Sequence, residues 1–290
     1  MYMSEAVMEA DEAMGRLDEI LKQQPMQESL EPRQPQNASV VFDHVTFTYP
    51  NALRPALDDV SFTVKPGQVV ALVGPSGGGK TTAASLIPRF WDVDQGCVSV
   101  GGADVRELDS RALMRQVAFV FQDTHLFKES LLDNIRAARP DASREEVLSA
   151  ARAAQCGDIL EKLPQGVDTV VGARGVYLSG GEGQRIALAR AILKDAPIVI
   201  LDEATAFADP ENEVQIQRAF EHLTQGRTVL MIAHRLSTVQ NADHILVLSD
   251  GKIAEQGTHK QLLAQGGVYA GMWSDYQRSA QWKIGREEAV

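Results

Sequence analysis

One segment of eight residues limits what this chain can fold into more than any other. It runs from Gly74 to Lys80-Thr81 as Gly-Pro-Ser-Gly-Gly-Gly-Lys-Thr, and it matches the pattern G-x-x-x-x-G-K-[ST]. The apolar run Gln68–Val73 before it is typical of a buried strand, and a helix is predicted after it, over about Gly79–Phe90. A strand, a glycine-rich turn and a helix in this order predict a loop that binds phosphate groups.

The residue types in this loop suit a nucleotide. Glycines allow backbone conformations that other residues avoid, and they let N–H groups approach an anion. We expect Lys80 to contact the β- and γ-phosphates and Thr81 to place its hydroxyl on Mg²⁺. Pro75 has no N–H, so the donors are expected from later residues. The nucleotide-binding residues predicted here are Gly74, Ser76, Gly77, Gly78, Gly79, Lys80, Thr81 and Thr82.

Two adjacent acids follow another apolar run. Ile198–Leu201 predicts a buried strand, and Asp202 and Glu203 come directly after it. We expect Asp202 to hold Mg²⁺ through water and Glu203 to polarise an attacking water. Acids in this position are also compatible with a solvated strand end, but the phosphate loop favours the catalytic interpretation.

The pattern of apolar residues along the chain is typical of an α/β protein preceded by a helix and a linker. Apolar spacing predicts a helix over residues 1–22, and the segment 23–38, rich in Pro, Gln and Glu, predicts a linker. Alternation over residues 45–49 and 60–64 predicts half-exposed strands. Because later apolar runs alternate with helical segments, we expect a largely parallel sheet. These later strands are predicted at Val117–Phe121, Ile198–Leu201, Thr228–Ala233 and Ile245–Leu248.

Short local patterns mark several boundaries. Capping-box patterns predict helix starts at Ser143 and Thr258. The pair Asp250-Gly251 predicts a two-residue hairpin turn.

Composition excludes several classes of protein. The 290 residues include 28 Lys and Arg against 39 Asp and Glu, a formal net charge of -11, which disfavours sequence-independent binding of nucleic acid or of an anionic membrane surface. The 2 cysteines fit a reducing compartment and predict no disulfide framework or metal cluster. No stretch approaches the roughly 18–20 apolar residues of a membrane span, and Met1–Ala10 has no basic region typical of a secretory signal. We therefore expect the chain as given to be cytosolic.

The segment Leu178-Ser-Gly-Gly-Glu-Gly-Gln-Arg185 points to one family. It resembles the signature sequence of ABC ATPases, and together with the phosphate loop, Asp202-Glu203 and His234 it is similar in order and spacing to an ABC nucleotide-binding domain. The resemblance covers residues 39–280. It implies an α/β fold with a P-loop NTPase core (RecA-like, mainly parallel sheet), an antiparallel β subdomain, and an α-helical subdomain at about 123–180. Residues 281–290 are left as a C-terminal tail.

The resemblance also implies a shared active site. In this family two domains meet head to tail, and each ATP lies between the phosphate loop of one and the signature of the other. The signature residues implied to act on the partner's nucleotide are Ser179, Gly180, Gly181 and Glu182. A serine hydroxyl and backbone N–H groups at a helix start suit a γ-phosphate.

Other roles are carried over position by position. Tyr49 matches the aromatic residue that stacks on adenine, and Gln122 matches the loop glutamine that senses Mg²⁺ and faces the membrane part. His234 matches the switch histidine at the γ-phosphate, and Asp209 matches the acid in the loop after Glu203. Taken alone, a Tyr at a strand end is more often a packing residue, and a His after a strand usually has a structural role. The resemblance therefore predicts Glu203 and His234 as catalytic residues and Thr81, Gln122 and Asp202 as residues of the metal site.

Flanking residues resemble the exporter-type branch, in which a membrane half precedes each ATPase domain. Taken alone, the helix 1–22 is more typical of a solvated amphipathic helix. Within this resemblance, it and the linker 23–38 fit the tail of such a half, which implies a position on the cytoplasmic side of the cell membrane. Three departures stand out: Ala206-Phe-Ala-Asp209 in the loop after the catalytic acid, Glu182 in place of the usual Gln, and Val170 where exporters often carry Glu. The run Ala206–Glu213 resembles half-transporters that import ferric siderophores, which suggests a substrate class.

The resemblance favours an ATPase motor that uses ATP and Mg²⁺ to drive transport. The partners it implies are a second nucleotide-binding domain, identical or a sister chain, and a transmembrane domain, with no nucleic acid. Two alternatives stay open: an ATP-gated regulatory module, and a soluble ABC ATPase that acts on nucleic acid or ribosomes. The transported molecule and the direction of transport are not fixed by this sequence.

Overall fold

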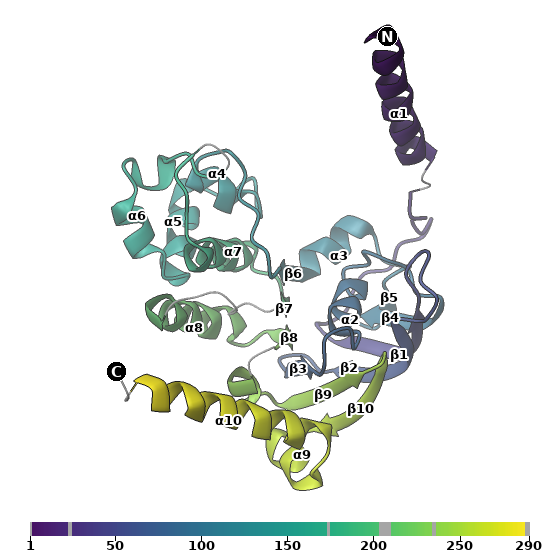
Figure 1. Ribbon diagram of the computed structural model, residues 1–290, viewed down its shortest axis with the longest axis vertical. Helices are drawn as coiled ribbons and strands as arrows, with labels where there is room; N and C mark the ends of the chain where they lie inside the picture. Colours follow the sequence, from purple (N-terminus) through teal and green to yellow (C-terminus); the bar gives the residue numbers. More distant parts are fainter. Residues whose placement is uncertain (1, 23–24, 173–174, 203–209, 234–235, 288–290) are drawn as a thin grey trace.

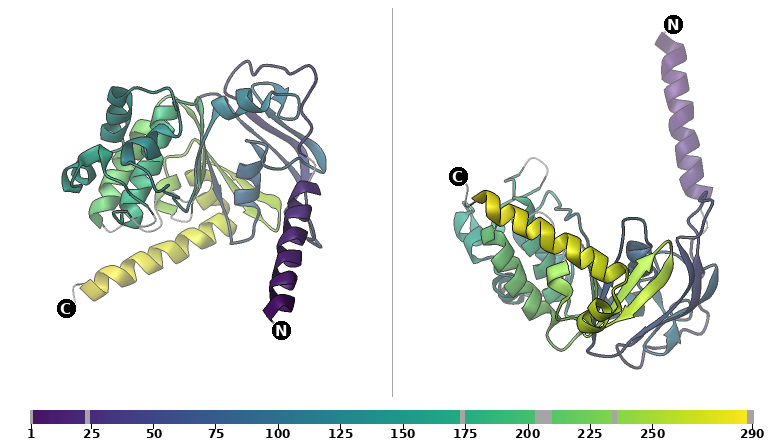
Figure 2. Two further views of the ribbon diagram at one scale, coloured as in Figure 1. Left: turned by 90° about the horizontal axis from the view of Figure 1, so that it is seen from above. Right: turned by 60° about the horizontal axis from the view of Figure 1, so that its bottom comes forward.

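The computed structural model describes residues 2–22, 25–172, 175–202, 210–233 and 236–287 (Figure 1). Two sheets and the helices on them form the body of the protein. The N-terminal helix α1 (Tyr2–Lys22) points away from that body in each view (Figures 1 and 2). It lies where the sequence predicts a helix. Within the described ranges, no helix combines the length and the apolar character needed to cross a bilayer.

A six-stranded sheet runs through the centre. Its strands lie in the order β10-β9-β3-β8-β7-β6, and neighbours pair in parallel except in the β9–β10 hairpin. The strands are β3 (Val69–Val73), β6 (Val117–Val120), β7 (Ile198–Asp202), β8 (Thr228–Ile232), β9 (His244–Ser249) and β10 (Lys252–Gly257). Mostly apolar runs form β3, β6, β7, β8 and β9, because helices or a second sheet cover both faces of these strands. The edge strand β10 instead alternates exposed and half-buried residues.

A smaller antiparallel sheet has the order β2-β1-β4-β5. Its strands are β1 (Val40–Phe47), β2 (Leu57–Val64), β4 (Gln95–Val100) and β5 (Ala103–Asp104). The linker runs along this part of the molecule, since the N–H of Arg33 donates to Glu107 O and the N–H of Gln36 donates to Gly101 O. The α/β fold is the one that the sequence pattern predicts, and the antiparallel β subdomain is the one that the family resemblance implies.

The helices cover the central sheet and build a helical subdomain on one side of it (Figures 1 and 2). Several begin at side-chain caps, including the capping boxes of Ser143 and Thr258 that the sequence predicts. The remaining helices are α2 (Lys80–Leu86), α3 (Ser110–Gln116), α4 (Leu131–Arg136), α5 (Arg144–Ala153), α6 (Gly157–Lys162), α7 (Gly180–Lys194), α8 (Pro210–Thr224), α9 (His259–Gln265) and α10 (Val268–Glu287), with 3-10 turns at Gly166–Asp168 and Leu236–Val239.

Two hydrophobic cores lie on opposite faces of the central sheet. Alternate residues of the strands point into each core: in β7, Val199 and Leu201 belong to one, and Ile198 and Ile200 to the other. The first core contains α7 and the helical subdomain, and the second contains α2 and the antiparallel sheet. The sheet therefore separates α2 from α7.

Candidate nucleotide-binding site

The predicted phosphate loop connects β3 to α2. Gly74, Gly77 and Gly79 have positive φ of 136°, 78° and 100°, a region that favours glycine. A Cβ on Gly74 would lie 2.0 Å from the carbonyl oxygen of Leu248 in β9, which passes beside the loop. Glycine is thus required here by backbone conformation and by close packing.

The side chain of Lys80 lies inside this loop. It is 5% exposed, and its Nζ donates hydrogen bonds to the carbonyl oxygens of Gly74 at 2.9 Å and Pro75 at 2.8 Å. Next to it, Thr81 is exposed on the first turn of α2. The arrangement holds a buried cation beneath a loop whose outer residues, Pro75 to Gly77, face solvent.

Tyr49 lies beside the loop. Its hydroxyl is 3.2 Å from the Thr82 hydroxyl on α2, and its ring makes edge contacts with Phe47 (centroids 4.9 Å apart) and Trp91 (5.5 Å). The residue is half-buried, so part of the ring remains available to a ligand. Its contacts make it a packing residue and also fix it next to the predicted phosphate site.

The register of the sheet brings the other predicted residues to the same edge. Leu72 of β3, Ile232 of β8 and Asp202 of β7 are aligned across three adjacent strands. Asp202, 6% exposed, is therefore level with the strand end from which the phosphate loop starts. Gln122 follows β6, the next strand, and is exposed at this edge. Carboxyl ends of parallel strands are where ligands of such sheets bind.

Some predicted residues lie outside the described residues. These are Glu203, which follows Asp202, His234, which follows β8 by two positions, and the departure Ala206–Asp209. Their roles remain predictions. The strands that precede Glu203 and His234 both end at the edge that carries the phosphate loop.

The predicted signature forms the start of α7. Ser179 caps the helix: its Oγ accepts from the Glu182 N–H at 3.2 Å, and Glu182 Oε2 accepts from the Ser179 N–H at 2.7 Å. Gly180 and Gly181 occupy the first turn, whose N–H groups have no acceptor within the helix. A Cβ on Gly181 would lie 2.9 Å from the Cβ of Asn212 in α8. The reciprocal cap was missed in the sequence, although Ser-x-x-Glu is its usual pattern.

Glu182 has a third partner that the sequence analysis did not identify. The Nζ of Lys162, at the end of α6, lies 2.9 Å from Glu182 Oε1. Burial opposes ionisation of Glu182, but the hydrogen bonds from Lys162 and from the Ser179 N–H outweigh it and hold its pKa below the usual value. The carboxylate is therefore charged at neutral pH.

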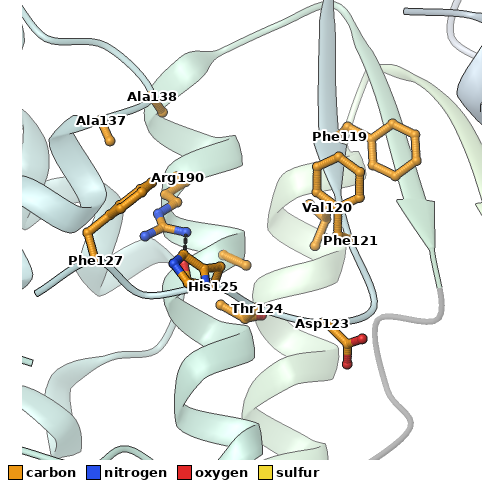
Figure 3. Close-up of a pocket in the computed structure, with 11 residues that line it drawn as sticks. Phe119, Val120, Phe121, Asp123, Thr124, His125, Phe127, Ala137, Ala138 and Arg190 are labelled. Atoms are coloured by element: carbon orange, nitrogen blue, oxygen red, sulfur yellow. Dashed lines mark hydrogen bonds between the residues drawn. The ribbon is translucent and has the colours of Figure 1, made fainter. Parts of the chain in front are cut away.

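A groove lies between the end of β6 and the helical subdomain (Figure 3), and its lining includes Phe121 and Asp123, the sequence neighbours of Gln122. Its volume is about 340 Å³, and Phe121 and Phe127 on its walls are 51% and 49% exposed. Phe119 and Phe121 stack on one side, with ring centroids 4.3 Å apart. Arg190 of α7 lies on the other side, over the ring of Phe127 at 5.8 Å. The groove offers an apolar surface that connects residues 121–125, here called the Gln122 segment, with the signature helix α7.

Arg190 and Asn134 fix the far wall of this groove. Arg190 donates to His125 O at 2.8 Å and to Asn134 O at 2.7 Å. Asn134, fully buried in α4, accepts from the Phe127 N–H and donates to Phe127 O. Sequence reasoning missed both residues, because contacts across 56 positions leave no local pattern.

The oxygen donors at the sheet edge fit Mg²⁺. Thr81 supplies an exposed hydroxyl, Asp202 a carboxylate and Gln122 an amide oxygen, and these are ligand types that a hard cation prefers. Among the described ranges, no group of three His, Cys, Asp or Glu is arranged to hold a metal. A cation here would thus be held by few protein ligands together with the nucleotide's own phosphates.

Comparison with known proteins places this site in context. The family model described as "ABC transporter" matches residues 57–206. The chain is 53% identical over 252 residues to the mycobactin import ATP-binding/permease protein IrtA of Mycobacterium tuberculosis, covering 86% of this chain and 29% of that protein. It is 51% identical over 236 residues to the ATP-dependent lipid A-core flippase of Methylobacillus flagellatus, covering 81% and 40%.

A solved structure from an ABC exporter has a similar fold. A bacterial Atm1-family ABC exporter with ATP bound superimposes with a TM-score of 0.83 at 40% identity, over 90% of this chain and 46% of that one. The chain thus spans less than half the length of each of these three proteins.

Proposed function

Because the chain belongs to the ABC transporter family, we propose that it is the ATP-binding and ATP-hydrolysing domain of an exporter-type half-transporter. One observation carries this proposal. The glycine-rich loop with its buried lysine, the Asp202 carboxylate and the Gln122 segment are aligned along one edge of a parallel sheet. This edge holds the donors that a nucleoside triphosphate requires.

In the proposed cycle the chain binds ATP mainly through its backbone and Lys80. The N–H groups of the loop and of the first turn of α2 hold the phosphates, and Lys80 neutralises their charge. Tyr49 packs against the base. Thr81, Asp202 and Gln122 would hold Mg²⁺, which supplies charge neutralisation for the phosphates. Glu203 orients the attacking water, and His234 contacts the γ-phosphate.

The second half of each site is proposed to come from another chain. The phosphate loop leads into α2 on one face of the sheet, whereas Ser179 starts α7 on the other face. Since the sheet lies between α2 and α7, one chain is poorly arranged to bring its own signature to its own nucleotide. Two chains arranged head to tail would complete two sites.

The groove of Figure 3 is the proposed contact with a membrane domain. Exposed phenylalanines next to Gln122 offer an apolar surface for an incoming helix. Because Arg190 of α7 also lines this groove, a displacement of the groove by a bound helix would move both the Gln122 segment and the signature helix. In the full transporter, Phe127→Asp should abolish stimulation of ATP turnover by substrate. If coupling were unchanged, another surface would carry it.

A substrate class is a finer proposal. A ferric siderophore is supported by the run Ala206–Glu213 and by a relative named for mycobactin import. Relatives named as lipid A-core flippases match this domain equally well, so the domain itself does not separate the two. Uptake of a radiolabelled ferric siderophore by vesicles carrying the full transporter tests it. ATP-dependent movement of lipid with no iron uptake would contradict it.

ATP turnover of the purified chain tests the main proposal. The wild type should hydrolyse ATP, and Glu203→Gln should bind ATP with hydrolysis nearly abolished, because the amide keeps the size but loses the charge that orients the water. Equal turnover in the two proteins would remove Glu203 from the reaction. Stimulation by DNA, RNA or ribosomes would favour the alternative of a soluble ABC ATPase, which the net charge of -11 disfavours.

A further inference from the structure

Two ion pairs join α6 to the start of α7. Asp158 of α6 accepts two hydrogen bonds from Arg185, at 2.6 and 2.8 Å, and Lys162 of α6 pairs with Glu182 at 2.9 Å. The α6 residues are four positions apart and the α7 residues three, so each helix presents one face to the other. The short helix α6 therefore acts as a brace along the first turns of the signature helix.

The second pair is unequal in its exposure. The side chain of Glu182 is 9% exposed, whereas that of Lys162 is 67% exposed. Glu182 also accepts a hydrogen bond from the Ser179 N–H. A solvent-facing cation is thus connected to the signature serine through a buried carboxylate.

Glu182 creates an electrostatic conflict at this helix start. A carboxylate in the first turn stabilises the helix through its N-terminal partial charge. The same carboxylate repels any anion that approaches that turn, and the sequences that this signature resembles usually have the neutral Gln there. Removing the positive charge of Lys162 would leave this repulsion uncompensated.

We propose that Lys162 is a positioning residue for the signature: by neutralising Glu182, it keeps the first turn of α7 able to receive the γ-phosphate of ATP bound to a second copy of the chain. The inference rests on the proposed shared site. If the ion pair were purely structural, loss of Lys162 or of Glu182 would weaken the dimer to the same extent. Neutralisation predicts opposite consequences for the two losses.

The experiment measures ATP-dependent dimerisation in Glu203→Gln protein, where hydrolysis does not dissolve the dimer. Adding Lys162→Met should weaken the dimer roughly tenfold, about 0.7 kcal/mol at each of two sites, by light scattering or sedimentation. Adding Glu182→Gln should leave the dimer as tight or tighter. With Glu182→Gln present, Lys162→Met should have no further effect, and Lys162→Arg alone should behave as the parent.

Two controls separate this effect from others. Lys22→Met also removes one positive charge and one ion pair, with Asp18, on an exposed helix, and it should leave dimerisation unchanged. Binding of ADP to the monomer's own loop, measured by calorimetry, should be the same in every variant, because only ATP is expected to drive dimerisation.

The outcomes are distinct. Equal weakening by Lys162→Met and Glu182→Gln, or no weakening by Lys162→Met, would overturn the positioning role while leaving the shared site intact. A Glu203→Gln parent that stays monomeric with ATP would overturn the shared site, and the role of Lys162 with it.

Discussion

The hydroxyl groups of Tyr49 and Thr82 lie 3.2 Å apart and connect the segment after β1 to the helix that follows the phosphate loop. Thr82 is the second residue after Lys80, so the contact ties the aromatic ring to the loop itself. The position of the ring is thus set by α2 as well as by its contacts with Phe47 and Trp91.

Tyr49→Ala should weaken ATP binding by about 1–2 kcal/mol, the range for losing a base–aromatic stack. Tyr49→Phe keeps the ring and loses only the hydroxyl contact, so its affinity should stay close to wild type. Isothermal titration calorimetry with ATP and GTP measures both, and the two nucleotides should be affected alike because stacking tolerates any base. Unchanged affinity in Tyr49→Ala would make Tyr49 a packing residue only.

Lys80→Ala should lower ATP affinity about 10- to 100-fold, because hydrogen bonds to a charged group contribute roughly 1.5–3 kcal/mol. The fold should be retained, since the loop loses the two hydrogen bonds from Lys80 Nζ but keeps its glycines and the backbone hydrogen bond from Gly78 N to Pro75 O. Calorimetry gives the affinity, and circular dichroism checks the fold. The control Lys65→Ala removes an exposed lysine at the end of β2 and should bind as wild type does.

Local patterns predicted the parts of the structure that depend on neighbouring residues. The family and the α/β fold are confirmed, and Asp250 and Gly251 form the predicted turn, with φ of 49° and 76°. The helix after the phosphate loop ends at Leu86 instead of about Phe90. Pro88 disfavours continuation of the helix, and Arg89 has a positive φ of 56°.

Contacts between distant segments could not be predicted in this way. The pair of Lys162 and Glu182 spans 20 positions and depends on how α6 packs on α7. Likewise, Asn134 looks like any polar helix residue in the sequence, yet it is fully buried and holds the loop at Phe127. By contrast, the location of Asp202 and of the phosphate loop at one edge of the sheet was predictable, because the carboxyl ends of parallel strands meet at one edge.

Asp158→Asn should destabilise the fold by about 1–3 kcal/mol. The substitution removes the negative charge that accepts two hydrogen bonds from the guanidinium of Arg185, a residue that is only 1% exposed. The hydrogen bonds from Arg185 hold the pKa of Asp158 below its usual 3.8. This stabilisation is therefore complete above the unfolded pKa and is lost as pH falls through the folded one. Urea unfolding from pH 7 to pH 3 should show the difference from wild type shrinking at the acid end.

Asp168→Asn is the matched control. Asp168 also accepts two hydrogen bonds from an arginine, Arg144, but both side chains are about half exposed. Stability should stay close to wild type at neutral pH. If the two substitutions cost the same, burial of Arg185 would not matter to the fold.

Two inactive chains should restore activity when mixed, because each complete site would need Lys80 from one chain and Ser179 from the other. A Lys80→Ala chain keeps its signature, and a Ser179→Arg chain keeps its phosphate loop. In the mixed dimer, one of the two sites pairs an intact loop with an intact signature, so turnover should rise above that of either variant alone. If ATP bridges two chains in this way, the specific activity of the purified wild-type chain should climb with protein concentration. Turnover per chain is measured across dilution to nanomolar concentration; a flat profile with a mixture that stays inactive would contradict the shared site.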